Sequence, residues 1–158
     1  MQSINKAVIF ESGNEEYAVP IQAVISIEKV NFINPIPHLP RYLKGVTKIR
    51  EELLPVIDFE YVLYKRMLPS LEEARLLIVQ TNSLPVGLLV KEAKEIIELP
   101  EESVRQVNLI SYENTRFFSG VATIGDRLIT IIDMDVLVSS LEGIDAVKDF
   151  MTESKDDQ

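Results

Sequence analysis

The chain has 158 residues, no cysteine and a formal net charge of -9 at pH 7. This length suggests one domain, or two small ones that share a core, and the lack of cysteine excludes disulfides, thiolate metal sites and cysteine nucleophiles. An acidic chain without a basic run is poorly suited to nucleic acid, which proteins bind largely by neutralising phosphates with Lys and Arg, and to anionic lipid surfaces.

Short β-rich runs separated by turn residues dominate the first half of the chain. Residues 7–10 and 17–21 flank a turn-forming cluster at 12–15 and predict a hairpin. Residues 24–30 partly alternate between apolar and polar, as a half-buried strand does. A proline-rich connector at 35–40 leads to a second predicted hairpin, 45–49 with 53–57. Asp58 then occupies an N-cap position, which predicts a short helix over 59–65.

The second half repeats this order of elements. Residues 75–80 and 86–90 predict a hairpin, a strand follows at 96–99, and residues 100–103 fit a short turn or helix. The last hairpin is predicted over 120–124 and 127–132, and Asp133 precedes a short helix over 134–141. Ile144, Val147 and Met151 fall at helical spacing, which predicts a C-terminal helix. The acidic residues from Thr152 onward are interpreted as a frayed end.

The two halves also match each other in sequence. Residues 45–49 align with 120–124, and residues 55–58 align with 130–133, at one offset of 75 positions. An earlier segment matches at an offset of 69, with Ile27 opposite Ile96 and Glu28 opposite Ile97. The alternative is that any two amphipathic hairpins share Val, Ile, Leu and Gly, and matching among apolar residues is weak evidence alone; of the two explanations, we favour an internal duplication.

The fold class follows from these elements. We expect an all-β protein in which each half supplies about five short strands, and five strands avoid exposed edges by curling into a small barrel. The prediction is two five-stranded barrels packed together over residues 1–143, with short helices and a groove between the barrels. Residues 144–158 form the predicted C-terminal helix and acidic tail. Grooves between subdomains are common binding sites.

Candidate catalytic groups have simpler structural explanations. Asp58 and Asp133 hold equivalent positions in the two halves, where each is expected to cap its own helix rather than converge as an acid–base pair. His38 is the only histidine and lies in the proline-rich connector, so a multi-histidine metal site is excluded. The sequence has no phosphate-binding glycine motif and no nucleophile elbow. We therefore expect no enzyme activity, no cofactor and no metal.

The order and spacing of several blocks resemble the CheW family of bacterial chemotaxis adaptors. The resemblance runs from about Lys6 to about Leu141, and the blocks that carry it are residues 17–24, 37–46, 49–50, 54–58, 86–90 and 118–122, followed by Asp133. It implies two SH3-like five-stranded barrels with a hydrophobic groove between them. It also implies a non-catalytic scaffold that binds the regulatory domain of the histidine kinase CheA and the cytoplasmic tip of methyl-accepting chemotaxis receptors.

The resemblance carries further expectations of partners, location and residues. We expect a cytoplasmic protein without direct membrane insertion or nucleic-acid binding, recruited to receptor arrays at the inner membrane face. The alternatives are a CheW-like scaffold of another receptor–kinase pathway and a small-ligand-binding β-barrel protein. The residues predicted to bind partners are Val24, Ser26, Ile27, Gly45, Ile49, Arg50, Leu88 and Val90.

Two departures from the family pattern concern the turn that contains Arg50. The family often has Asn-Leu-Arg-Gly there, whereas this chain has Lys48-Ile49-Arg50-Glu51, so the tight turn that glycine favours is expected to be altered. The family also often has a glutamate at the position of Ser26, which can pair with the arginine. Arg50 is therefore expected either to find another partner or to remain a solvated turn charge; as a surface anchor it would be a typical interface residue.

Overall fold

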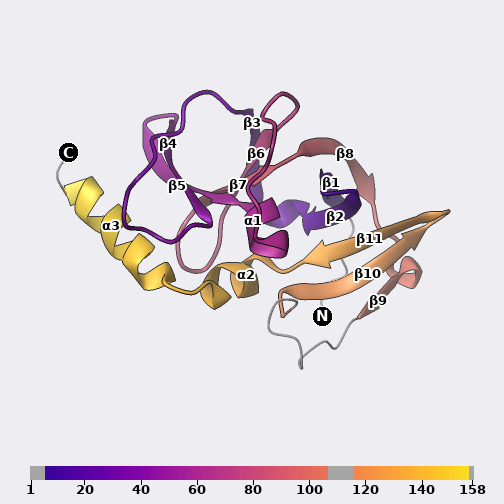
Figure 1. Ribbon diagram of the computed structural model, residues 1–158. Coiled ribbons are helices and arrows are strands. Elements are labelled where there is room, and N and C mark those ends of the chain that lie inside the picture. Colours follow the sequence, from indigo (N-terminus) through magenta and orange to yellow (C-terminus); the bar gives the residue numbers. More distant parts are fainter. Residues whose placement is uncertain (1–5, 107–115, 157–158) are drawn as a thin grey trace.

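The computed structural model describes residues 6–106 and 116–156, which form two small barrels and three α-helices (Figure 1). The strands are β1 (Lys6–Ser12), β2 (Glu15–Pro20), β3 (Val24–Lys29), β4 (Leu43–Ile49), β5 (Glu52–Asp58), β6 (Arg75–Val79), β7 (Val86–Val90), β8 (Glu92–Glu98), β9 (Val104–Gln106), β10 (Phe118–Ile124) and β11 (Arg127–Ile132). The helices are α1 (Phe59–Tyr64), α2 (Met134–Ser140) and α3 (Ile144–Asp156), with short 3-10 turns η1 (Ile21–Ala23) and η2 (Glu101–Ser103). The predicted hairpins and helices are confirmed.

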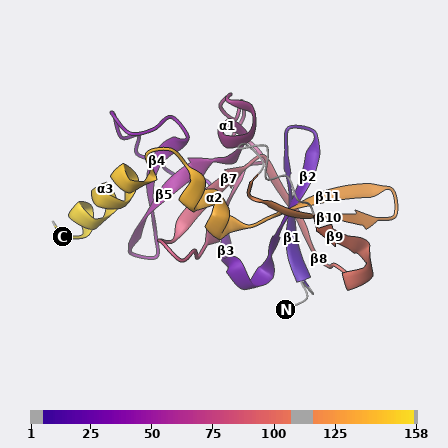
Figure 2. The same ribbon diagram turned by 90° about the horizontal axis from the view of Figure 1, so that it is seen from below.

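The strands fall into two sheets, each rolled into a barrel (Figure 2). Barrel A has the strand order β8-β1-β2-β11-β10-β9, and barrel B has the order β3-β6-β7-β5-β4. The all-β, two-barrel fold expected from the sequence is confirmed, with one addition. Barrel A carries a sixth strand, β9, which is only three residues long.

The assignment of one barrel to each half of the chain is wrong. The first hairpin, β1–β2, belongs to barrel A, where β2 runs parallel to β11. The hairpin β6–β7 belongs to barrel B, where β7 runs parallel to β5. Each half thus donates its first hairpin to the barrel that the other half completes. The two halves thus exchange equivalent hairpins, as in a two-fold symmetric pair. Because each barrel contains strands from both halves, the chain passes between the barrels and connects them covalently.

The internal duplication is visible in details of strand pairing. The hairpins β4–β5 and β10–β11 have matching register shifts, between Leu43 and Gly45 in one and between Phe118 and Gly120 in the other, 75 positions apart. The strands β3 and β8 also share a bulge, at Ile25 and at Lys94, 69 positions apart. Since irregularities of this kind are not required by apolar patterning, they support a true structural repeat.

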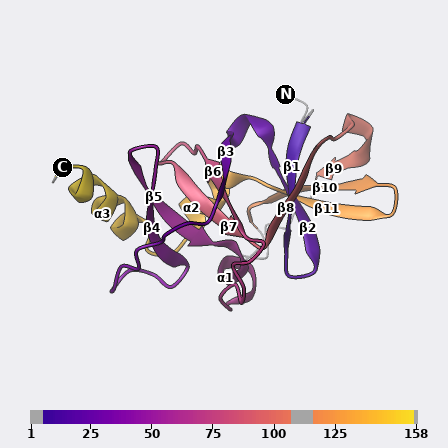
Figure 3. The same cartoon turned by 90° about the horizontal axis from the view of Figure 1, so that it is seen from above.

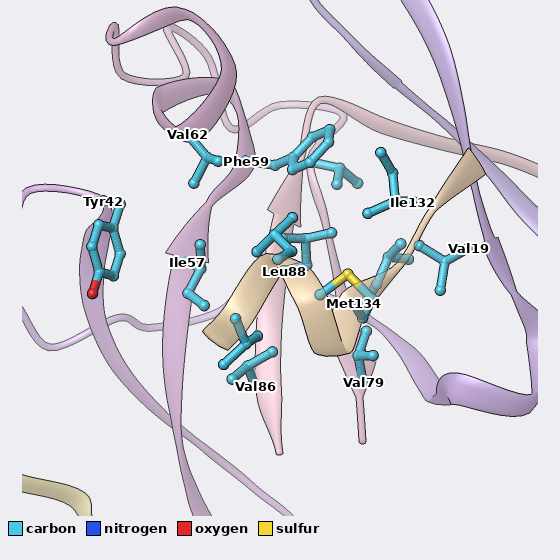
Figure 4. Close-up of a cluster of buried hydrophobic side chains, with 14 of the residues drawn as sticks. Val19, Tyr42, Ile57, Phe59, Val62, Val79, Val86, Leu88, Ile132 and Met134 are labelled. Atoms are coloured by element: carbon cyan, nitrogen blue, oxygen red, sulfur yellow. The ribbon is translucent and has the colours of Figure 1, made fainter. Parts of the chain in front are cut away.

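Three clusters of buried side chains hold the barrels together. Barrel A encloses one small core and barrel B another, and a larger third core lies between the barrels and includes residues of α1, α2 and α3. Figure 4 shows this inter-barrel core, with Val19 and Ile132 from barrel A close to Leu88 and Phe59. Strands that border it are buried on both faces, because alternate residues face the barrel interior and the neighbouring barrel.

The C-terminal helix lies beside β4 and β5, at the end of the molecule far from β10 and β11 (Figures 1 and 3). Ile144, Val147 and Met151 are buried against the inter-barrel core, as their helical spacing predicted. The expectation of a frayed end from Thr152 is wrong in part, because α3 continues to Asp156. No helix in the described part of the chain is both long and apolar enough to cross a bilayer.

Candidate partner-binding surfaces

The two aspartates that could have formed a catalytic pair each cap their own helix. Asp58 accepts a hydrogen bond from the Tyr61 amide at 3.2 Å, and its second oxygen accepts one from the Leu68 amide at 2.9 Å. Asp133 accepts one from the Val136 amide at 3.1 Å. Their predicted capping role is confirmed, and both carboxylates are occupied by backbone donors. Within residues 6–106 and 116–156, no cluster of three or more His, Cys, Asp and Glu side chains could hold a metal ion.

Strand β3 has an inverted pattern of burial. It is an edge strand, paired only with β6 in the sheet order, and its outward side chains are apolar: Ile25 is 54% exposed and Ile27 is 40% exposed. Its inward side chains include Ser26 and Glu28, of which the Ser26 hydroxyl is fully buried. Apolar side chains that face solvent beside an open strand edge are typical of a surface that binds another protein.

Ile25 was not among the predicted site residues. The bulge between Val24 and Ser26 makes Ile25 the extra residue of the strand and turns it to solvent, while Val24 is half-buried against the inter-barrel core. The signal was present in the sequence, since two consecutive apolar residues in an alternating strand cannot both face inward. A prediction of the bulge would have been needed to choose between them.

Arg50 finds a partner that sequence reasoning did not name. Its guanidinium Nη2 lies 3.4 Å from Oε2 of Glu28 on β3, and its side chain remains 74% exposed. The strands β3 and β4 are at opposite ends of the sheet order in barrel B, so this ion pair crosses the seam where the rolled sheet closes. Arg50 therefore lies beside β3 at the seam, next to Glu28 and on the opposite face of the strand from Ile27, and an exposed pair of this kind adds little stability.

The turn around Arg50 keeps the backbone geometry that glycine favours. Ile49 pairs with Glu52, which leaves a two-residue loop with φ of +49° at Arg50 and +72° at Glu51. Two consecutive positive φ values are typical of a type I′ hairpin turn. The expectation that replacing glycine alters the turn is wrong: the twist of the flanking strands selects this turn, and Glu51 adopts the left-handed conformation despite its side chain.

Ser26 is an unusual residue in its surroundings. Its hydroxyl is buried and has no hydrogen-bond partner among the described residues. A buried hydroxyl without a partner costs about 1 to 3 kcal/mol. The carboxylate that pairs with Arg50 instead comes from Glu28, two residues further along β3. Of the two outcomes expected for Arg50, another partner or no partner, the structure shows the first.

Three predicted site residues are too deeply buried to contact a partner directly. Leu88 and Val90 on β7 are 0% and 1% exposed and belong to the inter-barrel core. They face the other barrel, as predicted, but packed side chains fill the space that was expected to be a groove. Gly45 is also buried, and a Cβ atom added there would lie 2.1 Å from the carbonyl oxygen of Asn34. Its role is to let residue 34 approach β4, so Gly45 is required by the backbone, and a side chain such as that of Asp at this position should unfold the protein.

The structure thus separates the predicted residues into an accessible group and a supporting group. Ile27 and Arg50 are exposed, and Val24 and Ile49 are half-buried at the same edge of barrel B. One opening between the barrels is a cavity of about 260 Å³ between η1 and the start of α2, lined in part by Ala23, Ile132 and Met134. Val24 follows Ala23 directly, so this cavity lies next to the start of β3.

Strand β8 gives barrel A a second apolar edge. It is the structural equivalent of β3, it ends the strand order of its sheet, and Ile96, the counterpart of Ile27, is 52% exposed. The region of barrel B that we name the β3 edge consists of the exposed Ile25 and Ile27 on β3, together with Glu28 and its partner Arg50 at the seam beside them. The surface that we name the β8 edge consists of Lys94, Glu95 and Ile96.

Charged side chains surround the β8 edge. Arg127 on β11 donates two hydrogen bonds to Glu16, at 2.9 Å and 2.8 Å, and a third contact of 2.6 Å joins it to Glu95. Lys94 lies 3.8 Å from the same Glu16 carboxylate. The hydrogen bonds from Arg127 hold the pKa of Glu16 below its ordinary value, although partial burial opposes this. An exposed apolar residue that follows charged residues in an open edge strand is typical of a protein interface, where charged and apolar groups occur together.

Comparison with known proteins agrees with this architecture. A family model described as "CheW-like domain" matches residues 6–142. The chain belongs to this family. It is 31% identical over 144 residues to "Probable chemotaxis protein CheW" of Rhizobium etli, which covers 89% of this chain and 92% of that protein. It is 29% identical over 149 residues to "Chemotaxis protein CheW" of Bacillus subtilis, covering 91% and 93% of the two chains.

A solved structure shows the same fold. The crystal structure of the scaffolding protein TtCheW from Thermoanaerobacter tengcongensis superimposes with a TM-score of 0.80 at 27% sequence identity, covering 89% of this chain and 96% of that one. The chain is therefore a member of a family of chemotaxis scaffold proteins, and its two barrels have the arrangement of a CheW scaffold.

Proposed function

We propose that this protein is a non-catalytic adaptor that couples chemoreceptors to the histidine kinase CheA. Membership of the CheW-like family and the likeness to a scaffolding protein support the adaptor role. The observation that carries the proposal is the pair of equivalent apolar strand edges, one on each barrel, at Ile27 and Ile96. A protein with two separate apolar edges can hold two partners at once, which is what an adaptor requires.

The two edges differ in ways that suit different partners. The β3 edge carries two exposed isoleucines, and β3 starts next to the cavity between the barrels, so this edge suits the apolar face of a receptor helix. The β8 edge has one exposed isoleucine among charges and an open strand, so it suits edge-to-edge contact with a barrel of the kinase regulatory domain. Transient signalling interfaces are modest in size, and micromolar affinity, about 8 kcal/mol, is expected for each.

A reciprocal pair of variants tests the proposal. Ile27→Asp should abolish binding of a receptor cytoplasmic fragment and leave binding of the CheA regulatory domain unchanged, and Ile96→Asp should do the reverse. Both side chains are solvent-exposed, so both variants should stay folded, and each serves as the control for the other. Binding is measured by calorimetry with each purified partner. If neither partner binds the unmodified protein, the adaptor proposal fails, and if both variants bind both partners normally, the assignment of the edges fails.

Arg50 provides a further test at the β3 edge. Arg50→Ala removes a largely exposed side chain and one long ion pair, so stability should change by no more than about 0.5 kcal/mol. An arginine at the centre of an interface is worth about 2 kcal/mol or more, and we expect receptor-controlled kinase activity to fall. Lysine should restore it poorly because it lacks the planar fork of arginine. Full activity of the alanine variant in a reconstituted receptor–kinase–adaptor mixture would make Arg50 a solvated turn charge.

A further inference from the structure

A cleft of about 550 Å³ opens where both repeats meet the beginning of α3. It is distinct from the β3 and β8 edges and shares no residue with them. Arg41 and Lys65 line it from the first repeat, Arg116 lines it from the second, and Glu142 and Gly143 line it just before α3. Its volume is within the range of pockets that hold small molecules.

The two arginines of the cleft occupy equivalent positions in the duplication. They are 75 residues apart, which is the offset that relates β4–β5 to β10–β11. The residue after each arginine has the same role: the Tyr42 carbonyl accepts a hydrogen bond from the Asp58 amide and the Phe117 carbonyl accepts one from the Asp133 amide, both at 2.8 Å. The approximate two-fold symmetry of the chain therefore brings a pair of guanidinium groups to the walls of one cleft.

The charge in this cleft is opposite to that of the whole protein. Three cationic side chains and one carboxylate line the cleft, whereas the chain as a whole has a net charge of -9. Among the described residues, no carboxylate lies within 4.0 Å of the charged nitrogens of Arg41, Lys65 or Arg116. Arg127, by contrast, is matched by two glutamates. Like charges collected in a concave site attract an anion, because low-dielectric walls focus their field.

The wall of the cleft includes a tyrosine whose buried hydroxyl has no partner among the described residues. This residue, Tyr42, is only 7% exposed. A tyrosine hydroxyl is protonated at neutral pH even at its ordinary pKa of 10, and burial, with a smaller effect of the charge of Glu142, raises the pKa of this one further, to about 12. A buried donor without a partner is costly and is usually satisfied by a ligand or an ordered water molecule.

We propose that this cleft binds a small dianion, of the phosphate monoester or dicarboxylate class, held between Arg41 and Arg116. A guanidinium binds either oxyanion in a planar, two-pronged geometry. Two guanidinium groups, one from each repeat, match two negative charges better than one. A ligand bound there would link the first repeat, the second repeat and the start of α3, and would therefore stabilise their packing.

The proposal is tested by titrating the ¹⁵N-labelled protein with malonate, inorganic phosphate and acetate at constant ionic strength. We expect malonate or phosphate to shift the amide signals of Arg41, Tyr42 and Gly143 with saturation, and the ligand that saturates at lower concentration identifies the class. The double variant R41Q/R116Q should weaken this binding at least tenfold. The variant R105Q, which removes an exposed arginine of β9 outside the cleft, should bind like the unmodified protein.

Two results would overturn the proposal. One is equal affinity of R41Q/R116Q and the unmodified protein for the dianions. The other is the same shifts with acetate as with both dianions, spread over the surface without saturation. The double variant loses only exposed side chains and should keep the spectrum of a folded protein. If it does not, the single variants R41Q and R116Q, each expected to weaken binding, replace it.

Discussion

Gly45 provides the sharpest test of the fold, because a single methyl group added there meets backbone. In Gly45→Ala the new Cβ would lie 2.1 Å from the Asn34 carbonyl oxygen and 2.9 Å from a methyl carbon of Ile33. Residue 34 must then move away and lose its two hydrogen bonds with Val46, of 2.8 Å and 2.9 Å. Gly45 also has a φ of +153°, which side chains disfavour.

The expected magnitude follows from these contacts. Each lost hydrogen bond costs about 1 kcal/mol, and a backbone conformation that excludes side chains costs about 1 to 3 kcal/mol. Gly45→Ala should therefore lower the free energy of unfolding by about 3 to 5 kcal/mol, a large part of the 5 to 15 kcal/mol that is typical of a domain. Urea denaturation followed by circular dichroism measures it.

Two other glycines are matched controls for this measurement. At Gly120, the counterpart in the second repeat, an added Cβ would lie 3.0 Å from the Arg105 carbonyl oxygen and φ is not positive, so Gly120→Ala should cost about 1 to 2 kcal/mol. At Gly87 the nearest atoms are 3.5 Å away, and the change should be within about 1 kcal/mol. If Gly45→Ala is no more destabilising than Gly87→Ala, the close approach of residue 34 is refuted.

Three further predictions concern other parts of the molecule. Glu51→Gly should raise stability by about 0.5 to 1 kcal/mol because glycine adopts the left-handed conformation of this turn position without strain. Glu52→Gly, in the adjacent strand, should lower stability. If thermal melts show a change of the same sign for both variants, the turn assignment is refuted. Because the folded-state pKa of Glu16 is lowered, its contribution to stability is present above its ordinary value of 4.5 and is lost as pH falls through the lowered value. Glu16→Gln should thus flatten the acid side of the melting temperature profile, and an unchanged profile would contradict this. Val147→Asp places an unpaired charge on the buried face of α3 and should lower the free energy of unfolding, measured by urea denaturation, by about 3 kcal/mol or more. Ala146→Asp, at an exposed position of the same helix, should change it by no more than about 0.5 kcal/mol. Equal effects of the two variants would mean that α3 does not pack there.

Local structure was predicted well from the sequence because turns and helix caps are determined by residues that are close together in the chain. The hairpin turns and the caps at Asp58 and Asp133 depend on residues within a few positions of each other. The resemblance to CheW also predicted the fold. The sequence did not predict which hairpin joins which barrel, because both barrels offer β1–β2 and β6–β7 an apolar neighbour. That choice depends on pairing between residues far apart in the chain.

The candidate site was predicted less completely, for two different reasons. Leu88 and Val90 lie in a run of five buried residues, and such a continuous apolar run indicates burial on both faces, a signal that was available. Ile25 and Gly45 depend on tertiary details, since a bulge turns one to solvent and the bridge at Asn34 buries the other. The partner of Arg50 could not be read from spacing alone, because it lies across a barrel seam.

The exchange of hairpins sets the order in which the protein can fold during synthesis. The hairpin β1–β2 is synthesised well before its partner β11, which lies more than 100 residues later, so barrel A stays open until β11 has left the ribosome. Barrel B needs nothing beyond β7 and can close earlier. The first hairpin must therefore persist with an unpaired edge, a state that is prone to aggregation. A chain cut between α1 and β6 should yield two fragments that are each incomplete but complementary, so that they fold only when mixed.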